Sequence, residues 1–294
     1  MPVSTAMKTI GITLGDQAGI GPEIVDAALE RLALPDGVEV RVIGERLEGV
    51  VPGKPTLETA RAALDSLEES TRLMRDGEIA AVVTAPVAKE GLHQLGFDFP
   101  GQTEFFAERL DCENFAMCLT GRSLTVALVT IHVPIARVPG LLSEEEIVRV
   151  GALLAGFLEQ KNRRKARVAV CGLNPHAGEN GAFGDEEVTI IAPAIQLLGE
   201  RYPEAEFSGP HPPDTVFGAA AQGEYDGVLC MYHDQGLIPL KLLDFDNGVN
   251  VTLGLPVPRT SPDHGTAFGI AGKGIAKADS MLSAIQTACD LVRQ

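Results

Sequence analysis

The stretch TIGITLGDQAGIGPEIVDAALERL, residues 9–32, decides the fold class of this chain. It begins with a short apolar run that alternates β-branched residues with others, which is typical of a buried strand. A glycine-rich turn follows, and Pro22 stands where a helix accepts proline, in its first turn. The remaining apolar residues recur at helical spacing, so the stretch predicts one strand–turn–helix unit.

The same alternation continues along the whole chain. Short β-branched runs are separated by longer stretches rich in Ala, Leu and Glu, as expected of βα units built on a largely parallel sheet. We therefore predict an α/β fold without internal repeats. The expected strands are 9–14, 39–43, 80–84, 124–131, 167–171, 227–231 and 249–252, and the expected helices are 22–32, 56–75, 143–160 and 186–199.

Length and composition agree with this fold class. The chain has 294 residues, of which 45% are hydrophobic and 22% charged, so it has room for about two domains with sizeable cores. The net charge of −16 argues against a surface that binds nucleic acid or an anionic membrane. An anionic substrate would therefore need a local cationic pocket.

The cysteine content and the N-terminus indicate a cytoplasmic protein. Five cysteines make an odd number, and no metal-type CxxC pair occurs, which indicates reduced thiols. No apolar run approaches the ~18 residues of a membrane span. The first residues lack the layout of a signal peptide, and we expect residues 1–7 to form a loose leader before the first strand.

Three of the six histidines follow predicted strands. His132 closes LTVALVTIH, His176 comes one short turn after VAVCG, and His233 closes GVLCMYH. Parallel sheets bind ligands beyond the carboxyl ends of their strands, so three imidazoles in this position favour a catalytic site for a divalent metal. Separate histidines with structural hydrogen bonds are the alternative. We interpret His93, in a helix, and His211, in a proline-rich loop, as structural.

Residues 232–274 form the densest polar and glycine-rich part of the chain. Lys241, Asn250 and Arg259 within it are donors able to bind phosphate or carboxylate. They could supply the cationic pocket that the net charge demands. Ordinary surface charge is the alternative for Lys241.

Two shorter segments contribute further polar candidates. Lys89 ends TAPVAK, which follows a predicted strand, and Gln102 and Thr103 lie in the turn PGQTE. GDQAGIGPE, residues 15–23, resembles a phosphate-binding loop but matches neither nucleotide fingerprint. No nucleophile elbow and no HExxH helix occurs, so the sequence does not support covalent hydrolase chemistry.

Seven segments together resemble one family, the 4-hydroxythreonine-4-phosphate dehydrogenases of pyridoxal 5′-phosphate biosynthesis. In order they are GDQAGIGPE, TAPVAKEGLH, PGQTEF, LNPHAGE, MYHDQGLIPLK, GVNVTLGLP and RTSPDHGTAFGIAGKGIA. The resemblance runs from about residue 9 to the C-terminus. The last segment, from His264, is also similar to the cofactor loop of the isocitrate and isopropylmalate dehydrogenase superfamily.

The resemblance implies an isopropylmalate-dehydrogenase-like fold with two α/β/α domains flanking a cleft. The first domain would comprise residues 8–115 and 250–294, and the second residues 116–249. The protein would form a homodimer whose active site is shared between subunits. The implied metal ligands are His132, His176 and His233; the substrate contacts are Gln102, Thr103, Lys241, Asn250 and Arg259; the cofactor contacts are His264, Gly265, Thr266, Gly272 and Gly274.

The implied reaction is the oxidation of 4-phosphooxy-L-threonine by NAD or NADP with a divalent metal, which could be Zn, Mg, Co or Mn. The resulting 3-oxo acid would lose CO₂ and give 3-amino-2-oxopropyl phosphate. The residues leave the proton acceptor open among Lys89, Asp234 and Asp263. No nucleic acid and no membrane is expected as a partner.

Two departures from the family pattern favour a related substrate as an alternative. Gln102 stands where the family has a histidine, and an amide cannot carry a proton near neutral pH. The chain is also shorter than the members of the family, because few residues separate Ile43 from the predicted helix at Thr56. The alternative substrates are phosphorylated hydroxy acids such as 4-phospho-threonate or 4-phospho-erythronate. An alternative of another class is a catalytically silent protein that binds a metal or a ligand.

Overall fold

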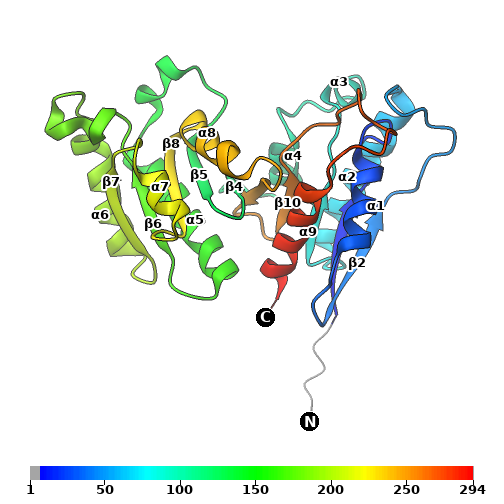
Figure 1. Ribbon diagram of the computed structural model, residues 1–294, viewed down its shortest axis with the longest axis horizontal. Coiled ribbons are helices and arrows are strands. Elements are labelled where there is room, and N and C mark those ends of the chain that lie inside the picture. The colour runs from blue at the N-terminus through cyan, green and yellow to red at the C-terminus, as the bar shows by residue number, and fades with distance from the viewer. Residues whose placement is uncertain (1–6, 294) are drawn as a thin grey trace, which may run out of the picture. The chain divides into compact units, whose positions relative to one another are not determined.

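The first strand–turn–helix unit forms as its sequence predicts. β1 spans Lys8–Thr13 and α1 spans Gly21–Arg31, with Pro22 in the first turn of the helix. The computed structural model describes residues 7–293 (Figure 1), so most of the expected leader lies outside the described residues. Strands and helices alternate along the chain, which confirms the predicted α/β class.

The chain divides into two compact units. Unit 1 runs to Glu113 and resumes at Val249, and unit 2 spans Asn114–Gly248. The functional roles implied for the two domains stay predictions.

Unit 1 contains a mostly parallel sheet in the order β2-β1-β3-β10-β9. β9 is antiparallel to β10, and the other neighbours run parallel. The central strands β1 and β3 are apolar and buried, as expected of parallel strands covered on both faces. The remaining bounds are β2 Val38–Ile43, β3 Ala81–Thr84, β9 Val249–Leu253 and β10 Arg259–Pro262.

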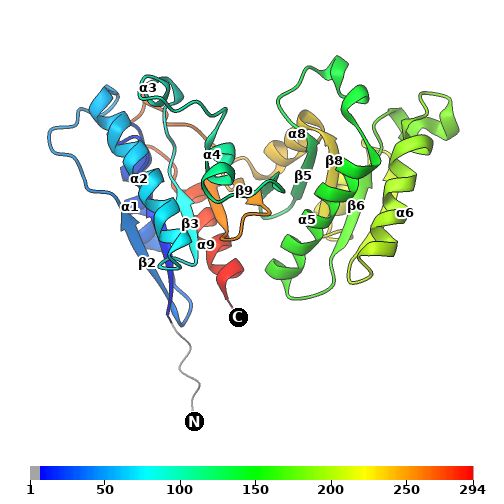
Figure 2. The same cartoon turned by 180° about the vertical axis from the view of Figure 1, so that it is seen from behind.

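Helices cover both faces of this sheet. α1 packs with α9 (Asp279–Val292) on one face, and α2 (Leu57–Arg75) covers the other (Figures 1 and 2). α3 (Lys89–His93) and α4 (Gln102–Arg109) contribute side chains to the same core cluster as α2. α2 starts at a capping box in which the Thr56 hydroxyl accepts from the Thr59 N–H.

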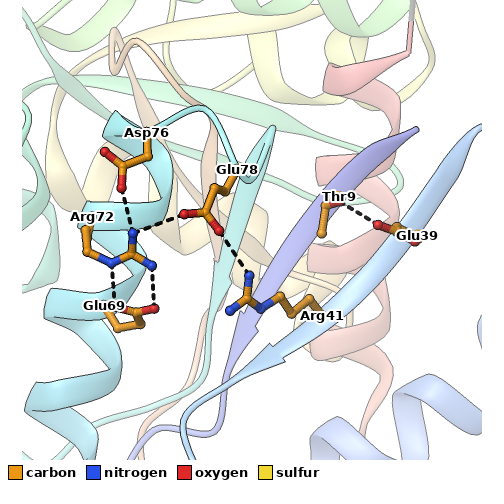
Figure 3. Close-up of polar contacts among 7 residues, drawn as sticks. All are labelled: Thr9, Glu39, Arg41, Glu69, Arg72, Asp76 and Glu78. Atoms are coloured by element: carbon orange, nitrogen blue, oxygen red, sulfur yellow. Dashed lines mark hydrogen bonds and ion pairs between the residues drawn. The ribbon is translucent and has the colours of Figure 1, made fainter. Parts of the chain in front are cut away.

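Arg72 organises the C-terminal end of α2 (Figure 3). Its guanidinium pairs with Glu69, Asp76 and Glu78, and Glu78 also pairs with Arg41 of β2. These side chains are about half exposed, so each pair contributes little to stability. Together they tie the turn between α2 and β3 to the outer strand of unit 1.

Unit 2 repeats the plan with the strand order β4-β5-β8-β6-β7. β4 (Ala116–Thr120) is antiparallel to β5 (Thr125–Thr130), and the others run parallel. The remaining bounds are β6 Arg167–Cys171, β7 Glu206–His211 and β8 Gly227–Tyr232. β5, β8 and β6 are therefore three adjacent parallel strands.

Two helices cover each face of the unit 2 strands. α5 (Glu144–Asn162) and α6 (Ala192–Arg201) lie on one face, and α7 (Val216–Ala221) and α8 (His233–Asp244) on the other (Figures 1 and 2). A π-helical turn, Glu187–Ile191, precedes α6. None of the five cysteines forms a disulfide. Within residues 7–293, no helix is long and apolar enough to cross a membrane.

Some elements differ from the prediction. β4, β7 and β10 were not expected, and His211 is the last residue of β7, so its placement in a loop is wrong. β7 and β10 contain proline and few apolar residues, which hides them from a search for apolar runs. The helix α4 and the helices after residue 200 were also missed, so the placement of Gln102 and Thr103 in a turn is wrong, because they begin α4. α8 contains Gly236 and Pro239, both of which weaken a helical pattern.

Candidate functional site

The three histidines of unit 2 follow its three adjacent parallel strands. His132 comes two residues after β5, and His233 follows β8 directly as the first residue of α8. His176 lies in the turn after β6. Because β5, β8 and β6 run parallel, their carboxyl ends share one edge of the sheet, which is where such folds bind ligands.

The structure brings two of these imidazoles together. The ring centroids of His132 and His233 are 5.5 Å apart, beside a pocket of about 460 Å³ lined by the end of β5 and the start of α8. The His176 ring instead packs near Phe183, with centroids 6.3 Å apart. In the described part of the chain, no three His, Cys, Asp or Glu residues are grouped closely enough to hold a metal ion.

Asp234 orients His233. One of its carboxylate oxygens lies 2.7 Å from the His233 Nδ1. When Nδ1 is protonated and its N–H donates a hydrogen bond to this carboxylate, the Nε2 lone pair is available to a ligand. Metal-binding histidines commonly have such a carboxylate partner.

Two of the three histidines have an unusual backbone conformation. The φ angles of His132 and His176 are 47° and 53°, in the left-handed region that residues other than glycine rarely adopt. The left-handed run continues through Asn180. Strained conformations of this kind cluster at functional sites, which supports a role for both loops.

Unit 1 contains a buried cation that forms no ion pair with the described residues 7–293. Arg259 is 3% exposed, and its guanidinium donates two hydrogen bonds to the Thr84 hydroxyl, at 3.1 and 2.7 Å. It also donates to the Gln102 side-chain oxygen at 3.1 Å and, at 3.4 Å, to the Thr252 hydroxyl. All of these acceptors are neutral.

Burial lowers the pKa of Arg259 to about 10, while the charge of Glu104 acts in the opposite direction. The guanidinium therefore stays protonated at neutral pH although it is desolvated. A buried charge that has only neutral partners is expensive unless a counter-ion joins it. An anionic ligand group would provide that counter-ion.

The other substrate-contact candidates of unit 1 lie near Arg259. The Thr103 and Thr252 hydroxyls are 3.4 Å apart. Thr252 pairs with Arg259 and Asn250 with Ser261 in the antiparallel ladder, so these four side chains share one face of the sheet. The Asn250 Oδ1 is buried and has no hydrogen-bond partner among the described residues.

The remaining candidates lie in α8, in α3 and in the segment after β10. Lys241 lies on α8 of unit 2, whereas Arg259 belongs to unit 1. Lys89 is exposed at the start of α3. The Asp263 N–H donates to the Ser280 hydroxyl just after β10. The His264 ring lies 3.2 Å from the Gly265 carbonyl oxygen.

The glycine-rich turn 15–23 supports the loop 264–274. The Ile20 N–H donates to the Thr266 carbonyl oxygen at 2.9 Å, and a Cβ on Gly19 would lie only 2.7 Å from that oxygen. Glycine is needed here for this close backbone approach. This contact accounts for Gly19 without a phosphate, and it places the turn beneath residues expected to bind the cofactor.

Sequence reasoning missed two hydroxyls of the site, Thr84 and Thr252. Thr84 ends β3 within the segment TAPVAK, where only Lys89 was singled out. Thr252 lies in β9 and looks like an ordinary β-branched strand residue. Their contact with Arg259 depends on strand pairing, which spacing along the chain does not reveal.

The fold of this chain is similar to that of a solved β-decarboxylating dehydrogenase. A solved β-decarboxylating dehydrogenase from Thermococcus kodakarensis aligns with 96% of this chain and 82% of its own, with a TM-score of 0.53 and 18% identity. At that identity the likeness concerns the fold alone.

The chain belongs to the family described as pyridoxal phosphate biosynthetic protein PdxA, whose model matches residues 17–288. A 4-hydroxythreonine-4-phosphate dehydrogenase of Desulfosudis oleivorans is 44% identical over 96% of this chain and 95% of its own. The crystal structure of the enzyme of that name from Klebsiella pneumoniae covers 99% of this chain and 100% of its own, with 39% identity and a TM-score of 0.84. The family resemblance of the motifs is confirmed.

Proposed function

We propose that this protein oxidises the secondary hydroxyl of 4-phosphooxy-L-threonine with NAD or NADP, as a step of pyridoxal phosphate biosynthesis in the cytoplasm. The 3-oxo acid formed loses CO₂ and gives 3-amino-2-oxopropyl phosphate. The observation that carries this proposal is Arg259, a buried cation of a family member whose hydrogen bonds go only to neutral groups. Such a group suits an anionic substrate in a protein whose net charge is −16.

The cluster around Arg259 would orient this substrate. The guanidinium binds an anionic oxygen, and Gln102 and Thr103 offer hydrogen-bond groups beside it. The unsatisfied Asn250 Oδ1 would accept a hydrogen bond from a substrate N–H or O–H. Lys241 adds a second cation from unit 2. Fixing the substrate by several groups supplies the orientation that hydride transfer requires.

Three imidazoles that follow adjacent parallel strands are a donor set whose chemistry suits a divalent metal. His132, His176 and His233 would hold it, and the Asp234 carboxylate keeps the His233 Nε2 available. When bound, a divalent ion such as Zn, Mg, Co or Mn lowers the pKa of a substrate hydroxyl and stabilises the charge that develops on its oxygen.

The loop 264–274 fits a dinucleotide. His264, Gly265, Gly272 and Gly274 are exposed, and nothing lies within 4 Å of a Cβ built on Gly265. The Gly265 backbone is therefore open to close approach by a ligand. The loop would hold NAD or NADP, which would supply the hydride acceptor.

The proton acceptor would be Lys89, Asp234 or Asp263. Asp234 is already engaged with the His233 Nδ1. Lys89 is exposed and has no hydrogen bond or ion pair from its side chain within residues 7–293. The Lys89 Nζ would be the atom that accepts the proton from the hydroxyl.

The proposal includes a homodimer, and α8 provides its surface. Ile238, Leu242 and Phe245 are 67%, 83% and 74% exposed, at the i, i+4, i+7 spacing of one helix face. An apolar stripe of this exposure is typical of an interaction surface. Lys241 lies on the same face by helical spacing, so a partner subunit seated there would meet it.

A substrate panel tests the proposal. The protein is assayed with 4-phosphooxy-L-threonine, 4-phospho-threonate and 4-phospho-erythronate, each with both cofactors and with Zn²⁺, Mg²⁺, Mn²⁺ or Co²⁺. The expected result is the highest kcat/KM for 4-phosphooxy-L-threonine. A higher kcat/KM for another acid would identify that acid as the substrate instead. Absence of NAD and NADP binding in calorimetry would show that the protein is catalytically silent.

A further inference from the structure

We infer that Gln235 is a positioning residue that holds the loops of His176 and His233 in one fixed arrangement; the inference rests on the proposed metal site. Gln235 lies in the first turn of α8, two residues after His233, and is only 6% exposed. Its side chain cannot reach solvent freely, so its amide must find partners inside unit 2.

Both ends of this amide bind backbone groups at strand ends. The Oε1 accepts from the Met231 N–H at 2.6 Å, and the Nε2 donates to the Gly172 carbonyl oxygen at 2.8 Å. Met231 lies in β8, two residues before His233, and Gly172 directly follows β6, four residues before His176. One side chain therefore joins the two strand ends that lead to these histidines.

The connection extends to the third histidine. The Thr130 hydroxyl donates to the Met231 carbonyl oxygen at 2.8 Å. Thr130 ends β5 two residues before His132. Thr130 and Gln235 thus bind the carbonyl and the N–H of the same residue, and a continuous chain of hydrogen bonds runs beneath all three candidate ligands.

The backbone that leads into the His176 loop has a second support. Glu187 is 2% exposed, and its Oε1 accepts from the Leu173 and Asn174 N–H groups, each at 2.7 Å. The backbone before His176 is therefore held by Gln235 through Gly172 and by Glu187 through the next two residues. The left-handed conformation at His176 requires such support.

The two Gln235 bonds require an acceptor and a donor on one side chain. An ionised glutamate keeps the acceptor for Met231 but loses the donor for Gly172 and brings a carboxylate against a carbonyl oxygen. Methionine fills similar volume and makes neither bond. Gln235→Met should therefore leave a folded unit in which the two histidine loops are no longer joined.

Binding of Co²⁺ alone tests the inference, measured by calorimetry and by the visible spectrum of the bound ion. We expect Gln235→Met and Gln235→Glu to weaken Co²⁺ binding by about 10- to 100-fold, the usual effect of losing a group that supports metal ligands. We also expect the Co²⁺ spectrum to change. The matched control is Thr125→Val, which removes the buried hydrogen bond to Thr120 at the opposite end of β5. It should lower the melting temperature and leave Co²⁺ binding unchanged.

The outcomes separate the inference from the proposed function. If the wild-type protein binds no Co²⁺, the proposed metal site is wrong and the inference with it. If the wild type binds Co²⁺ and a folded Gln235→Met protein has the same affinity and spectrum, the inference alone is overturned. If neither Gln235 variant folds, Thr130→Val decides, because it removes one bond of the same chain and keeps the β-branched shape. Unchanged Co²⁺ binding in that variant also overturns the inference.

Discussion

The buried charge of Arg259 destabilises the folded protein and provides a binding group for an anion. Its hydrogen bonds go to three neutral residues, and burial lowers its pKa to about 10. Burial therefore disfavours the charged form of the guanidinium. The unliganded protein therefore carries a destabilising charge that an anionic ligand would compensate.

The first prediction concerns the variant Arg259→Met. We expect kcat/KM for the phosphorylated substrate to fall at least about 100-fold, because buried hydrogen bonds to a charged group are lost. The free energy of unfolding at pH 8 should stay equal or rise, since the buried charge is removed. Steady-state kinetics and urea denaturation measure the two effects.

The pH dependence of this stability difference has a defined sign. The pKa of Arg259 is lowered in the folded state, so between about pH 10 and the unfolded pKa the unfolded state binds more protons. The wild type should therefore gain stability relative to Arg259→Met as the pH rises through about 10. An Arg259→Met protein that retains wild-type kcat/KM would contradict the assignment of Arg259 to substrate binding.

The second prediction concerns Asp234→Asn. The amide can no longer hold the His233 Nδ1–H as a carboxylate does, so we expect Zn²⁺ affinity to fall about 10- to 100-fold. Asp214→Asn is the control, because Asp214 is an exposed carboxylate outside the site and the charge change is the same. Equal Zn²⁺ affinities of the two variants in calorimetry would show that Asp234 does not support His233.

At the scale of elements, the sequence predicts the strands that carry the histidines and misses those that surround Arg259. β5, β6 and β8 are apolar, buried runs, so their carboxyl ends and the positions of His132, His176 and His233 follow from the sequence. β10 reads RTSP, and its burial comes from pairing with β3 and β9. The contacts of Arg259 with Thr84 and Thr252 arise from that pairing and could not be predicted from spacing.

The start of α2 allows a quantitative test at this scale. Thr56→Ala removes the hydroxyl that accepts from the Thr59 N–H, and we expect a loss of about 1 kcal/mol in the free energy of unfolding. Activity should be retained, because α2 contributes none of the candidate site residues. Chemical denaturation measures the loss. A change below about 0.3 kcal/mol would mean that the box does not stabilise the helix in the intact protein.

At the scale of the whole molecule, the exposed apolar face of α8 supports the proposed homodimer. Lys241 lies on the same face by helical spacing. In the proposed dimer, Lys241 of one subunit and Arg259 of the other would serve one substrate site. The two cations would make that site cationic in a protein whose net charge is −16.

Mixed dimers test this arrangement. Lys241→Ala and Arg259→Ala proteins are each expected to be nearly inactive. If the site is shared, unfolding and refolding them together should restore activity, because one site of each mixed dimer receives an intact Lys241 and an intact Arg259. Refolding each variant alone is the control. No recovery in a mixture that contains mixed dimers would place both residues in the same subunit's site.

The most direct test of the account measures bound metal and reduced nicotinamide in the same preparations. Wild type, His176→Ala and His93→Ala are compared, since His93 is an exposed helical histidine whose Nδ1 lies 2.7 Å from the Phe97 carbonyl oxygen. We predict one bound divalent ion and NADH or NADPH formation with 4-phosphooxy-L-threonine in the wild type and His93→Ala, and loss of both in His176→Ala. Wild-type metal content and turnover in His176→Ala would contradict the account.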